Sequence, residues 1–120
     1  IQGAIAQIEL AKTKTGGVSG VPTGFAQLDK LTAGWQRSDM VIIAARPAMG
    51  KTAFVLSMAR NIAVEHKKAV AVFSLEMSSG QLVQRILSAE SEIWLEKIAR
   101  GKLEEHEMKQ LYARGIQRLA

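Results

Sequence analysis

The stretch "ARPAMGKT", residues 45–52, decides the fold of this chain because it joins an apolar run to a helical pattern. The run before it, residues 40–45, is uninterrupted and β-branched at its centre, which predicts a strand buried on both faces. After it, apolar residues recur on one helical face from Lys51 to about His66. A second apolar run, residues 69–75, predicts another buried strand. Strand, glycine turn, helix and strand form a β-α-β unit, so we predict an α/β fold with a parallel sheet.

Further helices are predicted on the N-terminal side of this unit. Residues 1–12 place isoleucines at helical spacing, and residues 25–31 form a short helical pattern. Between them, residues 13–24 are dense in Gly, Ser, Thr and Pro, which indicates a linker. We therefore assign residues 1–14 to a separate helix and residues 15–24 to a flexible connection.

The C-terminal third is predicted to be helical. Ser78 or Ser79 can cap a helix, and Gln81 stands three residues after Ser78, as in a capping box. Two more helices follow, separated by Gly101, at about residues 93–99 and 104–119.

Three aromatic side chains lie outside the predicted strands and the glycine turn. Trp35, in a turn, is interpreted as an anchor at the edge of the core, although it could also stack on a base or a partner. Trp94 and Tyr112 lie in predicted helices, and we expect both to pack in the core.

The composition fits one soluble domain with a single core. The chain has 120 residues, 48% of them hydrophobic, and no cysteine, so a disulfide framework and a cysteine zinc site are excluded. No apolar run is long enough for a membrane span, and the first residues do not resemble a signal peptide. We expect a cytoplasmic protein with no membrane partner.

The formal net charge is +5. The excess lies in residues 1–60, the half that contains the glycine turn. It fits either a polyanionic partner or a mildly basic, solvated surface. No cluster of adjacent basic residues with interleaved aromatics appears, so a nucleic-acid groove is not predicted.

The glycine turn has the chemistry of a phosphate-binding loop. Gly50 lets the backbone approach a phosphate, Lys51 can reach the β- and γ-phosphates, and the Thr52 hydroxyl can ligate Mg²⁺. Ala45 replaces the first glycine of the usual pattern. The alternative is a tight turn with an ordinary surface lysine. We predict a nucleoside triphosphate site formed by Ala45, Arg46, Pro47, Ala48, Met49, Gly50, Lys51, Thr52 and Ala53.

Glu76 follows the second predicted strand, at the strand end where open α/β sheets bind ligands. Its carboxylate could orient or deprotonate an attacking water. It could also be an acid near the magnesium ion at the end of a Walker B strand. A third interpretation is a hydrogen bond to the start of the next helix.

The stretches "SGVPTGFAQLDKLTAGWQRSDMVIIAARPAMGKTAF" and "VAVFSLEMS" resemble the start of the RecA-like motor domain of DnaB-family replicative helicases. The resemblance covers essentially the whole chain, and loops of this family commonly begin with alanine, as at Ala45. It implies a RecA-like P-loop NTPase fold whose front half is residues 25–120. It also implies a homo-hexameric ring that hydrolyses ATP with Mg²⁺, moves on single-stranded DNA and unwinds the duplex.

The resemblance also implies roles for particular residues. Lys51 and Thr52 are similar to the residues that hold phosphates and Mg²⁺, and Glu76 to the catalytic glutamate that activates water. Arg46 is either a cation beside the nucleotide or a surface residue. Residues 1–14 resemble the linker helix that packs on the neighbouring subunit, although packing on its own domain is the alternative. Primase or loader proteins are implied partners of the full-length protein.

Several parts that the resemblance implies are not found in the chain. After Glu76 no apolar strand ends in an acid, so a Walker B aspartate is not assigned, nor are an arginine finger and DNA-binding loops. The chain is interpreted as a truncated motor domain. We expect it to bind nucleotide weakly and not to hydrolyse ATP at the rate of a helicase.

Three rival functions are weighed against the helicase. Another RecA-like ATPase, of the recombination or clock type, shares the loop but is less similar at "FSLEMS". A non-catalytic module could bind other subunits through its first helix. A small-molecule kinase would need substrate contacts and a lid, which the sequence does not show.

Overall fold

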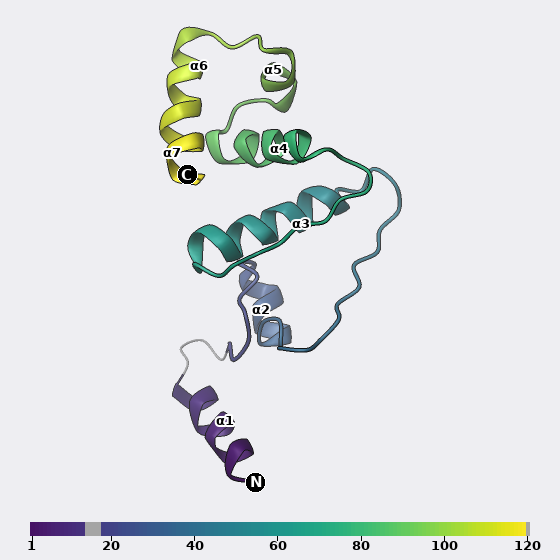
Figure 1. Ribbon diagram of the computed structural model, residues 1–120, viewed down its shortest axis with the longest axis vertical. Helices are drawn as coiled ribbons and strands as arrows, with labels where there is room; N and C mark the ends of the chain where they lie inside the picture. The colour runs from purple at the N-terminus through teal and green to yellow at the C-terminus, as the bar shows by residue number, and fades with distance from the viewer. Residues whose placement is uncertain (14–17, 120) are drawn as a thin grey trace.

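The helices begin and end where the sequence places caps and breaks (Figure 1). The computed structural model describes residues 1–13 and 18–119. The helices predicted from the sequence are confirmed as α1 Gln2–Thr13, α2 Ala26–Thr32, α3 Lys51–Arg60 with the π-helical turn η2 Asn61–Glu65, α4 Ser79–Ser91, α5 Leu95–Arg100, and α6 Glu105–Gln110 continued by the π-helical turn η3 Leu111–Ile116 and by α7 Gln117–Leu119.

Local side chains fix the ends of the C-terminal helices. The Ser78 hydroxyl accepts a hydrogen bond from the Gln81 N–H at 3.3 Å, and the Gln81 side chain accepts one from the Ser78 N–H at 3.0 Å. This capping box confirms Ser78 as the cap of α4. Glu104 and Glu107 form a second capping box at the start of α6. Gly101 ends α5 with a φ of 67°, a conformation that glycine adopts without steric cost.

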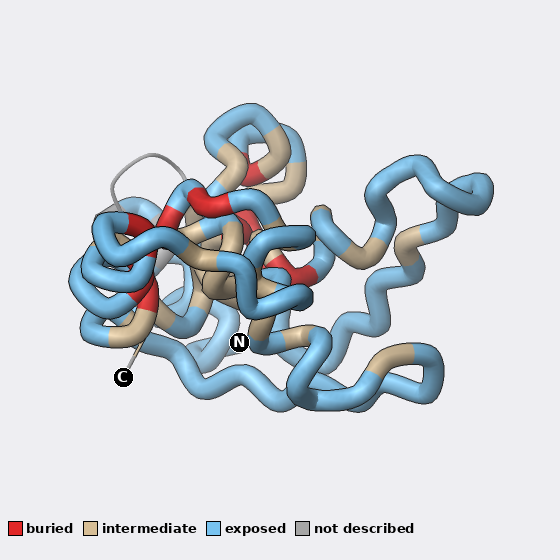
Figure 2. The backbone as a smooth tube through the Cα atoms, turned by 90° about the horizontal axis from the view of Figure 1, so that it is seen from above, coloured by how far each residue is buried: buried red, intermediate tan, exposed pale blue. Residues whose placement is uncertain are grey.

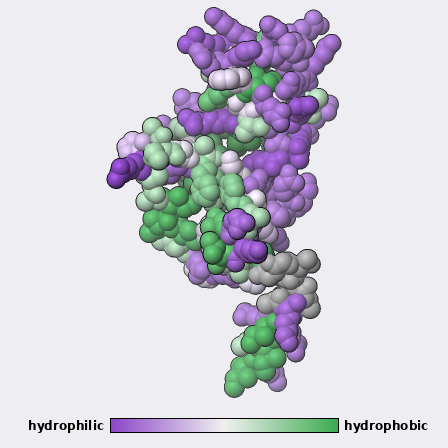
Figure 3. Space-filling view, turned by 180° about the vertical axis from the view of Figure 1, so that it is seen from behind, coloured by the Kyte–Doolittle hydropathy of each residue, from purple (hydrophilic) through white to green (hydrophobic). Residues whose placement is uncertain are grey.

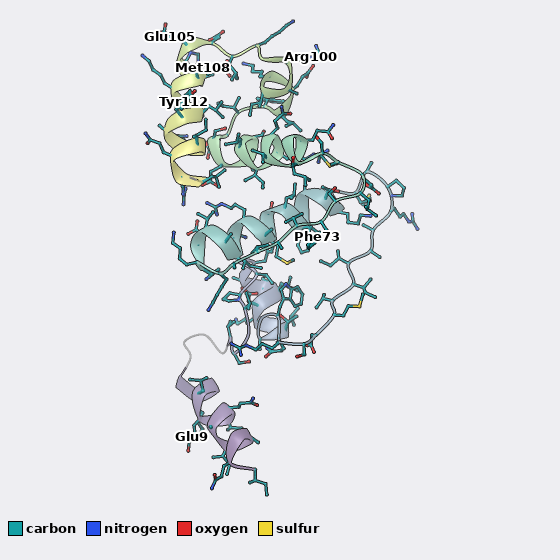
Figure 4. The ribbon with its side chains drawn as sticks, in the orientation of Figure 1. Glu9, Phe73, Arg100, Glu105, Met108 and Tyr112 are labelled. Atoms are coloured by element: carbon teal, nitrogen blue, oxygen red, sulfur yellow. The ribbon has the colours of Figure 1, made fainter. Side chains whose placement is uncertain are left out.

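The two predicted strands are not formed. Residues 40–45 and 69–75, the two apolar segments, are irregular, and no strand occurs within residues 1–13 and 18–119. Their side chains face solvent: Ile42 is 79% exposed and Phe73, labelled in Figure 4, is 95% exposed. A strand cannot satisfy its own backbone, and a parallel pair needs further strands and covering helices. The apolar segments find no such partners among the described residues, so the predicted parallel sheet is absent there.

The packed core lies between α3, α4 and η3. α4 contacts both α3 and η3, and α5 packs on α4 while α6 and α7 contact η3. The buried apolar side chains are Leu56, Met58, Ile93 and Leu111. A β-carbon at Gly115 of η3 would stand 3.2 Å from the Leu87 side chain, so the glycine allows η3 to approach α4 closely. Figure 2 shows that burial is confined to short stretches of the chain.

An ion-pair network ties α3 to α4 and to the C-terminal helix. Arg60 donates from Nε and Nη2 to the two carboxylate oxygens of Glu90, at 2.6 and 2.7 Å. Arg118 donates from Nε to Glu90 and from Nη2 to Glu65, both at 3.1 Å. The hydrogen bond with Glu90 is the main cause that raises the pKa of Arg60. Because the Glu90 side chain is only 6% exposed, this two-pronged pair is largely shielded from water.

The segment before the apolar run, residues 18–35, is fastened to α3. Its centre is the buried Thr23, whose N–H and hydroxyl donate to Asp29 Oδ1 at 2.8 and 2.7 Å. Asn61, after α3, donates from Nδ2 to the Thr23 carbonyl at 3.2 Å. A β-carbon at Gly24, whose φ is 86°, would lie 2.3 Å from Asn61 Nδ2, so only glycine fits there.

Two aromatic contacts complete this attachment. The rings of Phe25 and Phe54 stack with centroids 5.0 Å apart and an interplanar angle of 16°. The Trp35 indole N–H donates to the Met58 sulfur at 3.0 Å, which confirms the prediction that Trp35 anchors the edge of the core. Through Phe54 and Met58, the segment holds the helix that follows the glycine turn.

The isoleucine stripe of α1 is open to solvent. Ile1 is 101% exposed, Ile5 49% and Ile8 61%, and Figure 3 shows apolar surface on this end of the molecule. The predicted connection over residues 15–24 includes residues that, like 14 and 120, lie outside the described part of the chain. None of the described helices is both long enough and apolar enough to cross a membrane.

Candidate nucleotide site

The predicted phosphate-binding loop forms a turn that leads directly into α3. The Met49 N–H donates to the Arg46 carbonyl at 3.3 Å. Ala48 and Gly50 both have positive φ, of 63° and 86°. Gly50 is the residue before α3, and its carbonyl accepts the first hydrogen bond of the helix, from the Phe54 N–H at 2.9 Å. The left-handed turn at Gly50 thus directs the chain from the loop into the helix.

The space around Gly50 suits a bound anion. No atom lies within 4 Å of the position that a β-carbon would take at Gly50. Gly50 has no side chain that could cap α3, so it leaves the first N–H groups of the helix without a side-chain acceptor from the cap position. N–H groups at the start of a helix carry partial positive charge and bind phosphates. The turn therefore has the form of a phosphate site.

The predicted nucleotide residues lie together on this turn and on the first turn of α3. Met49 is 70% exposed, Lys51 is exposed and Thr52 is half-buried. The other members of the predicted set are Ala45, Arg46, Pro47, Ala48, Gly50 and Ala53, all exposed. The arrangement presents one ammonium and one hydroxyl beside the open glycine.

Glu76 lies in the bend that joins the second apolar segment to α4, and its side chain is exposed. The bend is held by a hydrogen bond from the Met77 N–H to the Ser74 hydroxyl at 3.1 Å. In Figure 1 α3 and α4 begin on the same side of the helical layer, so the bend and the loop lie on that side too. No hydrogen bond or ion pair joins Glu76 to the loop within residues 1–13 and 18–119, and its catalytic role stays a prediction.

The carboxylate of Asp29 has a structural part in holding α3. Burial raises its pKa, but hydrogen bonds from Thr23 and from the Gly24 N–H, together with the charge of His66, outweigh burial and bring the pKa below its ordinary value. Asp29 thus accepts hydrogen bonds as a charged group in a buried position. Its role was not predicted from the sequence, although an acid six residues after the threonine of a Thr-Gly pair is a signal for such a turn.

Two of the aromatic predictions are wrong. Trp94 is 78% exposed and Tyr112, labelled in Figure 4, is 54% exposed. The neighbouring residues Ile93 and Leu111 occupy the buried positions at these turns, so the adjacent aromatic side chains point outward.

Comparison with known proteins gives consistent matches. The family model described as the DnaB-like helicase C terminal domain matches residues 20–120. The replicative DNA helicase DnaB of Geobacillus stearothermophilus is 51% identical over 96 residues, which are 80% of this chain and 21% of that protein. The replicative DNA helicase DnaC of Bacillus subtilis (strain 168) is 48% identical over 100 residues, 83% of this chain and 22% of that protein.

A solved structure of a helicase ATPase domain is also similar. It matches 98% of this chain and 42% of its own with a TM-score of 0.86 and 33% sequence identity. The chain spans about a fifth of the length of the two helicase relatives. Its fold is therefore that of part of a helicase ATPase domain, and the chain belongs to the family of the DnaB-like helicase C-terminal domain.

Proposed function

We propose that the chain is the ATP-binding part of a replicative helicase motor. In the whole protein this motor would couple ATP hydrolysis to movement along single-stranded DNA and to unwinding of the duplex during replication. The observation that carries the proposal is the open, left-handed turn at Gly50 before α3. The relatives, which are named as replicative DNA helicases, support the choice of reaction.

The loop residues divide the work of holding ATP. The N–H groups at the start of α3 would bind the phosphate oxygens, and Lys51 would neutralise the β- and γ-phosphates. The Thr52 hydroxyl would ligate Mg²⁺, which supplies positive charge to the phosphates when bound. Arg46, on the same exposed turn, would lie beside the nucleotide.

Glu76 is proposed as the residue that orients the attacking water. Its support is the bend before α4, which lies on the same side of the helical layer as the loop before α3. Its exposed carboxylate is free of a capping role, because the Ser78 side chain already caps α4. This favours the catalytic interpretation of Glu76 over the capping one.

The two apolar segments are proposed to become strands of a RecA-like parallel sheet in the whole domain. Leu75 and Phe73 are almost fully exposed, a state that the hydrophobic effect disfavours for side chains of this size. The similarity to a helicase ATPase domain supports burial of these segments by the remainder of such a domain.

The isoleucine stripe of α1 is proposed to pack on a neighbouring copy in a homo-hexamer. The stripe is exposed at Ile1, Ile5 and Ile8, and unpaired apolar helix faces mark contact surfaces. In this arrangement residues 1–14 form the linker helix, 15–24 the connection and 25–120 the front half of the ATPase domain. Single-stranded DNA and primase or loader proteins are the proposed partners of the full-length protein, in the cytoplasm.

Calorimetric titration of magnesium and an ATP analogue into the chain tests the loop. Wild type is expected to bind, and Lys51→Ala to lose binding, because its ammonium is the cation placed at the start of α3. Lys68→Ala is the matched control, since it removes the same charge from an exposed position after η2. In the full-length protein, Glu76→Gln should keep nucleotide binding and lose ATP hydrolysis.

Two results would contradict the proposal. Equal binding by Lys51→Ala and Lys68→Ala would show that the loop is an ordinary turn. An absence of binding to wild type, in the chain and in the full-length protein alike, would favour an assembly module that acts through α1.

A further inference from the structure

The surface around α5 contains a hollow that shares no residue with the nucleotide loop. Its volume is about 370 Å³, and its lining is one aromatic side chain with three cations and one acid. The lining residues are Trp94, Glu96, Lys97, Arg100 and Lys102. The formal charge of this lining is therefore +2, since three positive charges face one negative charge.

The backbone of α5 fixes both walls of the hollow. At one end the Trp94 carbonyl accepts hydrogen bonds from the N–H groups of Lys97 and Ile98, at 3.0 and 3.3 Å. At the other end Gly101 reverses the chain, and the Lys102 N–H donates to the Lys97 carbonyl at 3.0 Å. This is the pattern of a Schellman turn, which folds the residue after the glycine back over the helix. Trp94 and Lys102 thus face one hollow through local geometry.

The indole of Trp94 is a free stacking surface. It is 78% exposed, and within residues 1–13 and 18–119 it makes no hydrogen bond and no ring contact. The other tryptophan, Trp35, is half-buried and donates its N–H to the Met58 sulfur. A large exposed aromatic side chain usually marks a contact surface. Trp94 therefore needs an explanation that Trp35 does not.

Two of the three cations are available to an anion. Lys97 is engaged by both oxygens of Glu107, at 3.1 and 3.0 Å. Arg100 pairs with Glu96 at 3.2 Å, but both side chains are about two-thirds exposed, and such surface pairs are weak. Lys102 forms no ion pair within the described residues. Arg100, labelled on α5 in Figure 4, and Lys102 can thus exchange water or a weak partner for a phosphate.

We propose that the hollow around Trp94 binds single-stranded nucleic acid, with one base stacked on the indole and a neighbouring phosphate contacted by Lys102 and Arg100. Aromatic stacking combined with a positively charged groove is how proteins bind single strands without sequence preference. The inference rests on the proposed function, because a motor that moves on single-stranded DNA is what brings a strand to this surface. The spacing along the chain did not predict the site, since Trp94 and Lys102 are eight positions apart and meet only through the turn at Gly101.

The flat indole face favours a nucleobase over an acidic peptide. A carboxylate-rich peptide would be attracted by Arg100 and Lys102 but has no planar group to cover Trp94. A nucleotide supplies a planar base and an anion on one unit, and the hollow is within the size range of small-ligand sites. Binding of an acidic peptide is therefore an outcome that the experiment must separate.

The test follows binding of a fluorescently labelled oligothymidylate to the chain by anisotropy at low salt. Trp94→Leu is expected to weaken binding about tenfold, the loss of one base stack. Lys102→Gln should weaken binding several-fold and make it less dependent on salt, because one phosphate contact is lost. Lys109→Gln, the same charge change on an exposed residue of α6, is the matched control and should bind like wild type.

A second measurement detects the stack directly. In a Trp35→Phe background Trp94 is the sole tryptophan, since the chain contains two, and its emission should be quenched by unlabelled oligothymidylate. Equal affinity of Trp94→Leu and wild type, no detectable binding by wild type, or quenching by poly-glutamate but not by the oligonucleotide would each overturn the proposal. Lys51→Ala should leave the quenching unchanged. A failure of the nucleotide loop is thus distinguishable from a failure of this site.

Discussion

The α3–α4–η3 layer and the two apolar segments are equally apolar in sequence and end in opposite environments. In the helical layer Leu56, Ile93 and Leu111 are buried, with exposed fractions of 5%, 4% and 7%. In the apolar segments Phe73 and Leu75 are 95% and 106% exposed. Figure 3 shows the resulting apolar surface in the middle of the molecule.

The difference comes from where each structure finds its hydrogen bonds. A helix satisfies its backbone within one segment, so α4 forms from its own capping box and packs through one face. A strand takes its hydrogen bonds from other strands, and a parallel sheet is stable only with both faces covered. The helical half of a β-α-β unit can therefore form where the strand half cannot.

Hydrogen exchange should show the contrast at its largest. Amides of α4 are expected to exchange slowly, because opening them requires loss of the core; an unfolding free energy of about 5 kcal/mol would slow exchange roughly a thousandfold or more. Amides of residues 69–75 should exchange at nearly the rate of an unfolded chain. In the full-length protein the same amides should become protected. Equal protection of both regions in this chain would contradict the comparison.

Truncating one side chain in each region compares them by stability. Ile93→Ala removes a side chain that is 4% exposed and should lower the free energy of unfolding by about 3 kcal/mol. Phe73→Ala removes a larger side chain from solvent and should change it by less than about 0.5 kcal/mol. Urea denaturation followed by circular dichroism measures both. A larger loss for Phe73→Ala than for Ile93→Ala would show that the apolar segment packs in solution.

The same distinction separates what could be predicted from the sequence from what could not. The capping box at Ser78 and the break at Gly101 are local signals, and both were predicted correctly. The strands over residues 40–45 and 69–75 were predicted from apolar runs, which report a tendency to be buried but not the presence of partners. The parallel sheet therefore could not be assured by any pattern within those runs.

The candidate site divides along the same line. The loop at Gly50 is contiguous with α3, so its position at the helix start could be predicted from spacing alone. Glu76 is separated from the loop by the whole of α3, and its position relative to the loop depends on the sheet. The hollow at Trp94 depends on the chain reversal at Gly101, and the helical periodicity placed this indole in the core instead.

A buried and an exposed aspartate on either side of Trp35 give the smallest test of the comparison. Asp29 lies in the fastened segment and accepts hydrogen bonds from Thr23 and Gly24, while Asp39 is exposed directly before the first apolar segment. Asp29→Asn should cost about 1.5–3 kcal/mol at neutral pH, the range for hydrogen bonds to a charged group. Asp39→Asn should cost less than about 0.5 kcal/mol.

The pH dependence separates the charge of Asp29 from its shape. Because its pKa is lower in the folded chain, the carboxylate contributes stability above the unfolded pKa of about 3.9, and that contribution disappears as pH falls through the lower folded value. The difference in unfolding free energy between wild type and Asp29→Asn should therefore be constant near neutral pH and shrink below about pH 4. Urea denaturation at several pH values measures it. A difference that persists unchanged in acid would mean that the amide disturbs packing around Thr23, and that the charge does not hold this segment on α3.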